Sequence, residues 1–426
     1  MTIKEMKITV LTLGCKTNLA ESDSLKTEAL DAGHRLVDLG ESPEVCIINT
    51  CTVTGKSDYQ SRQLMRRALR AGARVIVTGC YPEVAAQEIT AISSDIEIVK
   101  NSKKLNIINK LLPKNNNNTL SSRLPTPNTG SAIGRSRPIV KIQDGCNYSC
   151  TYCSIHLARG RSVSRPVRDV VSDLRKLEGL GYAEAVLAGI HIGAYGLDLK
   201  PKVNISSLVA NILNNTEKIR IRLSSIGVNE IDDALIELLQ DSRVCPHLHI
   251  PLQSGDDGIL RLMKRPYDSG LFRERIEYIL GRFENISVGT DVIVGFPGES
   301  EEGFQSTVKL LEDLPMSYLH IFPYSPRPGT AASKMQMYVH GDVKGRRLRL
   351  LRGLDAEKRA VYKKRQIGRL LNAVYETPAE SGLQKGKSEN YLNLYFEKHD
   401  VLPGRAVKVR IRDTFKDGLL GSAIEN

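Results

Sequence analysis

The stretch "DGCNYSCTYCS", residues 144–154, places three cysteines within eight residues. Three residues separate Cys146 from Cys150, and two separate Cys150 from Cys153. A disulfide needs two cysteines and a closed zinc site needs four ligands, whereas three thiolates can hold a [4Fe-4S] cluster and leave one iron free. The spacing therefore favours an iron–sulfur cluster with one open coordination position. A zinc site completed by His156 is the alternative.

The composition is that of a globular protein rather than a membrane or disulfide-rich one. The chain has 426 residues, of which 41% are hydrophobic and 25% charged, and its length predicts about three domains. No apolar run approaches the roughly 20 residues that span a bilayer, and the first residues lack a signal-peptide cleavage pattern. We therefore expect a cytoplasmic protein with no membrane partner. In that reducing compartment, its eight cysteines suit metal binding or chemistry better than disulfides.

The charge pattern favours a polyanionic partner. The net charge is +12, and residues 344–369 carry eleven Lys or Arg against two acidic residues, which gives 11 − 2 = +9. A solvated helix face is the alternative explanation for such a run. Its concentration favours a contact with nucleic acid.

Residues 1–112 alternate strand-like and helix-like runs, as in a parallel α/β sheet. The strand-like runs "MKITVLTL", "EVCIINT" and "RVIVTG" are each followed closely by a cysteine, namely Cys15, Cys51 and Cys80. Because the carboxyl ends of parallel strands meet at one edge of the sheet, we expect these three thiols to converge. Cys46 lies inside a strand and is predicted to be a buried core thiol.

The rest of the chain divides by composition. Residues 113–135 are rich in Asn, Ser and Pro and are predicted to form a linker. Residues 136–366 contain about six strand–helix units, which predicts a partial (β/α)6 barrel, shorter than the eight units of a full barrel. Residues 367–426 contain short strands with Gly or Pro turns, as in a small β-barrel. Such barrels often bind RNA, and a structural capping domain is the alternative.

The motif "CNYSCTYC" after a strand resembles that of the radical S-adenosylmethionine superfamily. In that superfamily the free iron binds the amino and carboxylate groups of S-adenosylmethionine, whose reductive cleavage gives a 5′-deoxyadenosyl radical. The resemblance therefore implies S-adenosylmethionine as a cofactor and a low-potential electron donor as a partner.

The same resemblance implies five cofactor-binding positions. Tyr152 corresponds to an aromatic residue near the adenine, and Gly189 in "VLAGIHIG" to a glycine near the amino group. Ser225, Gln253 and Asp291 resemble further positions that line the cofactor. A glycine that permits close backbone packing is an alternative for Gly189, and satisfaction of backbone groups is an alternative for the polar residues.

Along essentially the whole chain, the sequence resembles the methylthiotransferase family. The motifs that carry this likeness are "LGCKTNLAES", "INTCTVT", "VTGCYPE", "CNYSCTYCSIHLARG", "HLHIPLQSGDDGILRLMKRPY", "TDVIVGFPGES" and "FPYSPRPGTAA". The resemblance implies a C-terminal TRAM domain and a second [4Fe-4S] cluster, held by Cys15, Cys51 and Cys80, that supplies sulfur.

The family has branches that act on different substrates. The motifs look most like the bacterial branch that converts N6-threonylcarbamoyladenosine at position 37 of tRNA to its 2-methylthio derivative, so the implied partner is a tRNA anticodon stem-loop. Branches acting on N6-isopentenyladenosine in tRNA or on a ribosomal-protein aspartate are alternatives. An RNA-binding protein stabilised by zinc, without catalysis, is the non-enzymatic alternative.

Two further groups of residues are candidates for substrate contacts. Arg405, Lys408 and Arg410 cluster around one predicted strand of the C-terminal barrel. His247 and His249 alternate with a leucine and should share one face of a strand. His249 is the more plausible site residue, although a hydrogen-bonded core histidine is an equal alternative.

Overall fold

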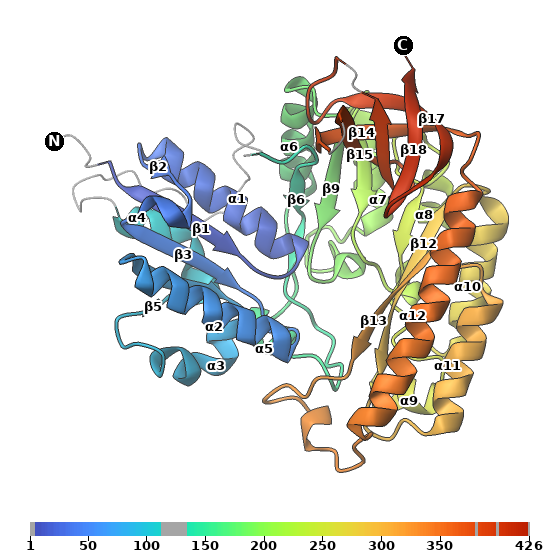
Figure 1. The fold of residues 1–426 in the computed structure, drawn as a ribbon, viewed down its shortest axis with the longest axis horizontal. Helices are drawn as coiled ribbons and strands as arrows, with labels where there is room; N and C mark the ends of the chain where they lie inside the picture. The colour runs from blue at the N-terminus through green and yellow to red at the C-terminus, as the bar shows by residue number, and fades with distance from the viewer. Residues whose placement is uncertain (1–4, 112–133, 380–381, 398–399, 425–426) are drawn as a thin grey trace.

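The computed structural model describes residues 5–111, 134–379, 382–397 and 400–424 (Figure 1). Nearly all of the predicted linker, up to residue 133, lies outside the described residues. The described chain is α/β, with a parallel sheet at the N-terminus, further parallel strands in the centre and a small barrel at the C-terminus. No helix in the described part of the chain is both long and apolar enough to cross a bilayer.

The N-terminal sheet has five parallel strands in the order β2-β1-β3-β4-β5. The predicted strands are confirmed as β1 (Lys7–Thr12), β3 (Val45–Thr50) and β4 (Arg74–Gly79), whereas β2 (Arg35–Leu36) and β5 (Glu97–Ile98) are too short to be predicted. Helices α1 (Lys16–Asp31) and α4 (Ile107–Leu111) contribute to one core, and α2 (Gly55–Arg70) and α3 (Tyr81–Thr90) to another.

Side chains of β3 alternate between these two cores, as the two-residue period of a strand requires. Val45 and Ile47 belong to the core with α1, whereas Cys46 and Ile48 belong to the core with α2. Cys46 is fully buried, so the prediction of a core thiol is confirmed.

The central strands form two parallel sheets, β10-β9-β6 and β11-β12-β13, which a bridge between Ile221 and Val244 connects. The strands are β6 (Ile139–Lys141), β9 (Glu184–Ala188), β10 (Arg220–Leu223), β11 (His247–His249), β12 (Ser287–Val294) and β13 (Tyr318–Pro323). The helices that alternate with or follow them are α6 (Val167–Gly179), α7 (Ile205–Asn215), α8 (Asp233–Leu238), α9 (Asp257–Leu262), α10 (Ser269–Arg282), α11 (Glu301–Asp313) and α12 (Gly341–Lys364). In the described chain β6 and β13 remain unpaired edges, so this set of strands is open on one side.

The C-terminal strands close into a barrel in the order β14-β15-β16-β18-β17. They are β14 (Leu370–Pro378), β15 (Leu383–Ser388), β16 (Asn393–Glu397), β17 (Ala406–Phe415) and β18 (Gly418–Ile424). The barrel docks on the central strands through the buried guanidinium of Arg222, which donates hydrogen bonds to the carbonyls of Ser388 and Glu389 at 3.0 and 2.9 Å. The same guanidinium pairs with Glu184 at 2.7 Å, so one buried charge links two parts of the chain.

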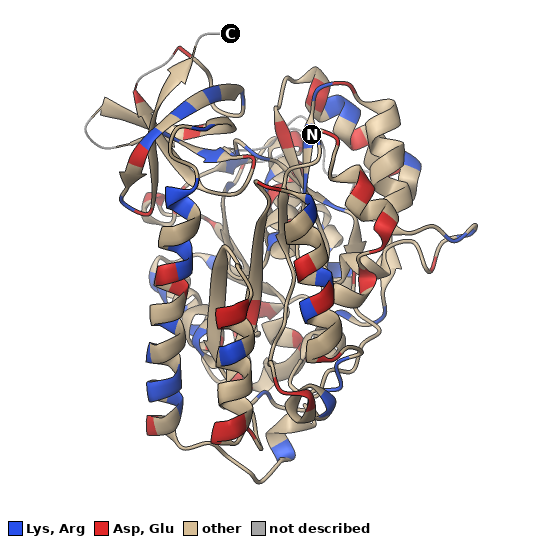
Figure 2. Cartoon of the chain, turned by 90° about the vertical axis from the view of Figure 1, so that its right-hand side faces the viewer, with Lys and Arg blue, Asp and Glu red and all other residues tan. Residues whose placement is uncertain are grey.

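The basic run at residues 344–369 lies mainly on α12 and is only partly available to a ligand (Figure 2). Arg347 is buried and pairs with Glu299 at 2.7 Å, because the helix packs there against the N-terminus of α11. Arg359 pairs with Asp355, and Arg369 pairs with Glu284. Arg347 therefore stabilises the fold and is not available for the nucleic-acid contact predicted for this run.

Candidate active site

The three closely spaced cysteines lie at one cavity of about 180 Å³. Cys146, Cys150 and Cys153 follow the short strand β7 (Gln143–Asp144) and precede helix α5 (Ile155–Arg159). Three of the predicted cofactor residues line the same cavity, namely Tyr152, Ser225 and Gln253. We call this space the thiol cavity.

Each sulfur at the thiol cavity accepts a hydrogen bond. The backbone N–H groups of Tyr148 and Ile155 donate to Cys146 and Cys153, both at 3.4 Å, and the guanidinium of Arg265 donates to Cys150 at 3.2 Å. A thiolate is a much better acceptor than a neutral thiol, so three converging donors suit anionic sulfur. Burial raises the pKa of Cys153 to about 12, and a bound metal must therefore displace its proton. This set of donors fits a cluster held by three thiolates.

The N-terminal cysteines also converge, as predicted from the strand ends. Cys15 and Cys80 cap the N-termini of α1 and α3. Gly14 adopts φ +104°, and a Cβ there would lie 2.7 Å from Cβ of Cys51, so only glycine permits this approach. Burial is the main cause that raises the pKa of Cys51 to about 11, and the neighbouring Cys80 and Cys15 also contribute to that rise. The structure thus contains a second group of three neighbouring thiols.

Residues next to the two thiol groups are in contact with one another, and we call this contact the seam. It is formed by Thr52, Ser154 and Arg159. Thr52 follows Cys51, and its carbonyl accepts a hydrogen bond from the Ser154 hydroxyl at 3.5 Å. Arg159 donates from Nε to Sγ of Cys80 at 3.3 Å. Residues adjoining the thiol cavity therefore contact residues of the N-terminal thiol group directly.

A buried ionic network surrounds Arg159. Its guanidinium pairs with Glu21 at 2.7 Å and Asp144 at 2.9 Å, while Lys104 and Lys141 pair with Glu21 at 2.6 and 2.7 Å. Against the effect of burial, these cations hold the pKa of Glu21 well below its usual value. Three basic groups face two carboxylates, which leaves one positive charge in excess beside Cys80. Burial raises the pKa of the Cys80 thiol, and the positive charge of Arg159 opposes that rise.

Two of the predicted cofactor residues lie outside the lining of the thiol cavity. Gly189 packs on Gln143, whose Oε1 would lie 2.9 Å from an added Cβ, so close packing accounts for this glycine. Asp291 pairs with His249 at 2.8 Å and with His320 at 3.4 Å. Against the effect of burial, hydrogen bonds from these histidines lower the pKa of Asp291.

The predicted shared face of His247 and His249 is confirmed. Both imidazoles lie within hydrogen-bonding distance of the Tyr318 hydroxyl, at 2.8 and 3.0 Å. His249 is therefore a hydrogen-bonded histidine on the face of the β11-β12-β13 sheet that also carries Tyr318.

Other lining residues of the thiol cavity escaped the sequence analysis. They are Arg265, His191 and Glu230, each carried by a loop or a short 3-10 helix. His191 lies 3.6 Å from Sγ of Cys146 and pairs with Glu230 on its other side. No spacing rule connects these residues to the cysteines, since the fold alone brings them together.

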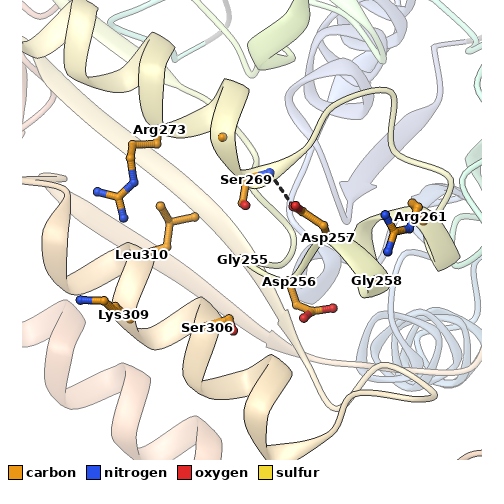
Figure 3. Close-up of a pocket in the computed structure, with 11 residues that line it drawn as sticks. Gly255, Asp256, Asp257, Gly258, Arg261, Ser269, Arg273, Ser306, Lys309 and Leu310 are labelled. Carbon is orange, nitrogen blue, oxygen red and sulfur yellow. Dashed lines mark hydrogen bonds between the residues drawn. The ribbon is translucent and has the colours of Figure 1, made fainter.

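A larger hollow of about 500 Å³ lies between α9, α10 and α11 (Figure 3). There Asp257 accepts a hydrogen bond from the Ser269 backbone N–H at 2.8 Å. None of the cysteines or predicted cofactor residues lines this hollow. Size therefore does not identify the active site, whereas the donors aimed at sulfur do.

Comparisons with known proteins agree with this geometry. A model of the Radical SAM superfamily matches residues 140–311, and one described as Uncharacterized protein family UPF0004 matches residues 7–100. The threonylcarbamoyladenosine tRNA methylthiotransferase MtaB of Bacillus subtilis (strain 168) is 35% identical over 94% of this chain and 92% of its own length. The chain belongs to the radical S-adenosylmethionine methylthiotransferase family. The MtaB protein of Aquifex aeolicus (strain VF5) is also 35% identical, over 95% of this chain and all of its own length.

A solved structure supports the fold of this methylthiotransferase. The radical S-adenosylmethionine methyltransferase TsrM from Kitasatospora setae superposes with a TM-score of 0.55, at 15% identity, over 77% of each chain. The likeness concerns the fold alone. A radical enzyme of this family is expected to bind a [4Fe-4S] cluster and S-adenosylmethionine, and the thiol cavity offers three thiols with matched donors.

The packing of the Tyr318 ring on β12 of this methylthiotransferase requires a residue without a side chain at Gly289. A Cβ there would lie 2.0 Å from Cζ of Tyr318, because that ring lies across the strand. Replacing Gly289 with alanine should lower the free energy of unfolding by about 1–3 kcal/mol through overpacking. Urea denaturation of the full-length chain would measure it. Gly281→Ala in α10, with no heavy atom within 4 Å of its added Cβ, is the control and should not destabilise; an equal loss in both variants would contradict the argument.

Proposed function

We propose that this methylthiotransferase converts N6-threonylcarbamoyladenosine at position 37 of tRNA to 2-methylthio-N6-threonylcarbamoyladenosine. The single structural observation that carries the proposal is the seam, at which residues that follow Cys153 contact Cys80 and the neighbour of Cys51. The relatives named threonylcarbamoyladenosine tRNA methylthiotransferase, which match over nearly the whole chain, support the choice of substrate.

Cys146, Cys150 and Cys153 would hold one [4Fe-4S] cluster, and Cys15, Cys51 and Cys80 would hold a second. When bound, these clusters and S-adenosylmethionine supply a radical able to remove hydrogen from an unreactive C–H bond, together with the sulfur and methyl groups. The chain's own residues would bind these groups and orient their ligands. Arg265 and Arg159 each donate a hydrogen bond to a cysteine sulfur. Tyr152, Ser225 and Gln253 line the space for S-adenosylmethionine.

Gln253 also carries backbone strain at this site. Its φ is +71°, a left-handed conformation that is uncommon for residues other than glycine, and it pairs with Val292 in an isolated bridge. Such strain persists where the surroundings enforce it and is frequent at ligand sites. This observation supports a ligand-facing role for the Gln253 side chain.

The domain assignment follows from the same proposal. Residues 1–112 form the cluster domain, residues 136–366 form a radical core built as a partial (β/α)6 barrel, and residues 367–426 form a TRAM RNA-binding barrel. The enzyme works in the cytoplasm with a low-potential electron donor. RNA bases in loops can be unstacked and read singly, so the target base of the anticodon loop would flip towards the open side of the strands.

Two of the three residues of the C-terminal barrel that were predicted to contact RNA remain candidates for that role. Lys408 and Arg410 lie on β17 and are exposed, whereas Arg405 precedes the strand. Arg405 lines a crevice with Gly181 and Tyr182 at the end of α6, because the barrel packs there on the central part of the chain. We propose Lys408 and Arg410 as phosphate contacts and assign Arg405 to docking of the barrel.

Nucleoside analysis tests the substrate. In tRNA from a deletion strain, 2-methylthio-N6-threonylcarbamoyladenosine should disappear and N6-threonylcarbamoyladenosine should accumulate, as measured by mass spectrometry. Complementation with the wild-type gene is the control. Persistence of the 2-methylthio nucleoside in the deletion strain would contradict the proposal. Loss of the isopentenyl counterpart, or of a methylthio group on a ribosomal-protein aspartate, would instead identify another branch of the family.

A further inference from the structure

A second cavity lies where β13, α12 and the C-terminal barrel meet, and we call it the cationic cavity. Its volume is about 120 Å³, the room that about four water molecules occupy in the liquid. Its lining includes three basic and four aromatic side chains. They are Arg359, Lys363, Lys387, Tyr318, His320, Tyr362 and Tyr391.

Lys363 and Lys387 are the cations of this cavity that can meet an anionic ligand, because Arg359 pairs with Asp355 at 2.8 Å. Lys387 also donates a hydrogen bond to the side chain of Asn393. The one acidic residue in its lining, Asp417, accepts hydrogen bonds from Tyr395 and Asn393, both at 2.6 Å. Within the described residues, neither Lys363 nor Lys387 forms an ion pair with a carboxylate. Burial and the nearby Arg137 lower the pKa of Lys387 to about 8, which is the behaviour of an ammonium short of negative partners.

Aromatic rings hold the cations in place. The Nζ of Lys387 lies 4.8 Å from the centre of the Tyr391 ring, and the guanidinium of Arg359 lies 5.1 Å from that of Tyr318. Tyr391 itself has φ +71° and stacks on His247 at 4.3 Å, so a strained backbone presents this ring to the cavity. The positive groups are therefore arranged before any ligand binds.

Neighbouring strands connect the cationic cavity to the thiol cavity. Gln253 lines the thiol cavity, and its N–H donates to the carbonyl of Asp291 at 2.8 Å. Asp291 is the register partner of His320, which lines the cationic cavity and pairs with that carboxylate. Two strand spacings, about 10 Å, thus separate the two linings.

We infer that the cationic cavity binds the carboxylate of the threonylcarbamoyl group on the target adenosine, an inference that rests on the proposed function. C2 and N6 flank N1 on the same edge of adenine, so a base whose C2 faces the thiol cavity can extend its threonylcarbamoyl group along the strands and direct the carboxylate to Lys387 and Lys363. Hydrogen bonds to a charged group in a partly buried site are strong enough to decide between substrates. An RNA phosphate presents the same anionic oxygen chemistry, and the experiment separates the two sources.

Binding to defined RNAs tests the inference with the reconstituted full-length enzyme under anaerobic conditions. Three short anticodon stem-loops would carry N6-threonylcarbamoyladenosine, its methyl ester or unmodified adenosine, and fluorescence anisotropy would give each Kd. The wild type should bind the free carboxylate about tenfold more tightly than the ester. Lys387→Met and Lys363→Met should each reduce this ratio, and the double variant should bring it close to one while affinity for the ester is retained.

A matched control comes from α12. Lys364 directly follows Lys363, is exposed and does not line the cationic cavity, so Lys364→Met should keep the full preference. A preference that survives in the double variant would overturn the inference, as would equal weakening of all three RNAs, which would indicate a phosphate contact. A wild type that modifies the threonylcarbamoyl RNA yet binds its ester equally well would also overturn it. A wild type that neither prefers nor modifies this RNA would instead contradict the proposed function.

Discussion

Replacing Cys150 with alanine should abolish reductive cleavage of S-adenosylmethionine, whereas replacing Cys51 should leave that cleavage measurable and stop methylthiolation. The two residues belong to different thiol groups, and only Cys150 lies at the thiol cavity. 5′-Deoxyadenosine formed with a chemical reductant would report the first reaction, and mass spectrometry of tRNA nucleosides the second. Iron analysis should give about eight irons for the wild type and about four for either variant.

Cys46→Ala is the control for the different effects expected of Cys150→Ala and Cys51→Ala. Cys46 is at least as buried as Cys51 and Cys150, but it packs in the core between β3 and α2 and belongs to neither thiol group. Its replacement should preserve both reactions and the iron content. Equal loss of both reactions in a folded Cys51→Ala protein would show that the two thiol groups do not act separately. A colourless wild type containing zinc and no acid-labile sulfide would favour the non-enzymatic alternative.

Replacing Arg159 with methionine should lower the free energy of unfolding by about 3–5 kcal/mol, because it leaves the buried carboxylate of Glu21 and the partly buried carboxylate of Asp144 with fewer partners. Its side chain is 1% exposed and pairs with both Glu21 and Asp144. The remaining cations, Lys104 and Lys141, reach Glu21, but only Lys141 reaches Asp144. Chemical denaturation of the metal-free full-length chain would measure the loss.

Arg74→Met is the matched control for Arg159. Arg74 also pairs with a glutamate, Glu97, but at the surface, where its side chain is 53% exposed. Exposed ion pairs contribute little, so this variant should change the free energy of unfolding by less than about 1 kcal/mol. If Arg159→Met costs no more than the control, the network does not stabilise the seam.

The site could be predicted from the sequence where its residues follow local rules. Cys146, Cys150 and Cys153 are close in sequence, so their spacing alone defines a three-thiolate site. Cys15 and Cys51 are distant, but each follows a strand of a parallel sheet, and that topology brings them together. Strands rich in β-branched residues were also predictable, since one periodic pattern sets both the strand and its buried face.

Residues that depend on packing between distant elements could not be predicted. Arg159 and Arg265 donate to cysteines 79 and 115 residues away, and no spacing in the sequence encodes such pairs. Arg347 looks like any other cation of a basic helix, and only the contact with Glu299 shows that it is structural. Strand β15 has the polar sequence "LQKGKS" and buries small or polar residues such as Gly386 and Ser388, so it lacks a hydrophobic alternation.

The separation in sequence of the seam residues sets an order of events during synthesis of the chain. Thiols within eight residues can gather a metal ion in a nascent chain at little cost in loop entropy, whereas Cys15, Cys51 and Cys80 meet only after three strands have paired. Arg159, which contacts Cys80, leaves the ribosome 79 residues later than that cysteine. The hydrogen-bond donor to Cys80 is therefore made after all three N-terminal thiols, so the surroundings of that cysteine are completed only once residues 144–159 have been translated.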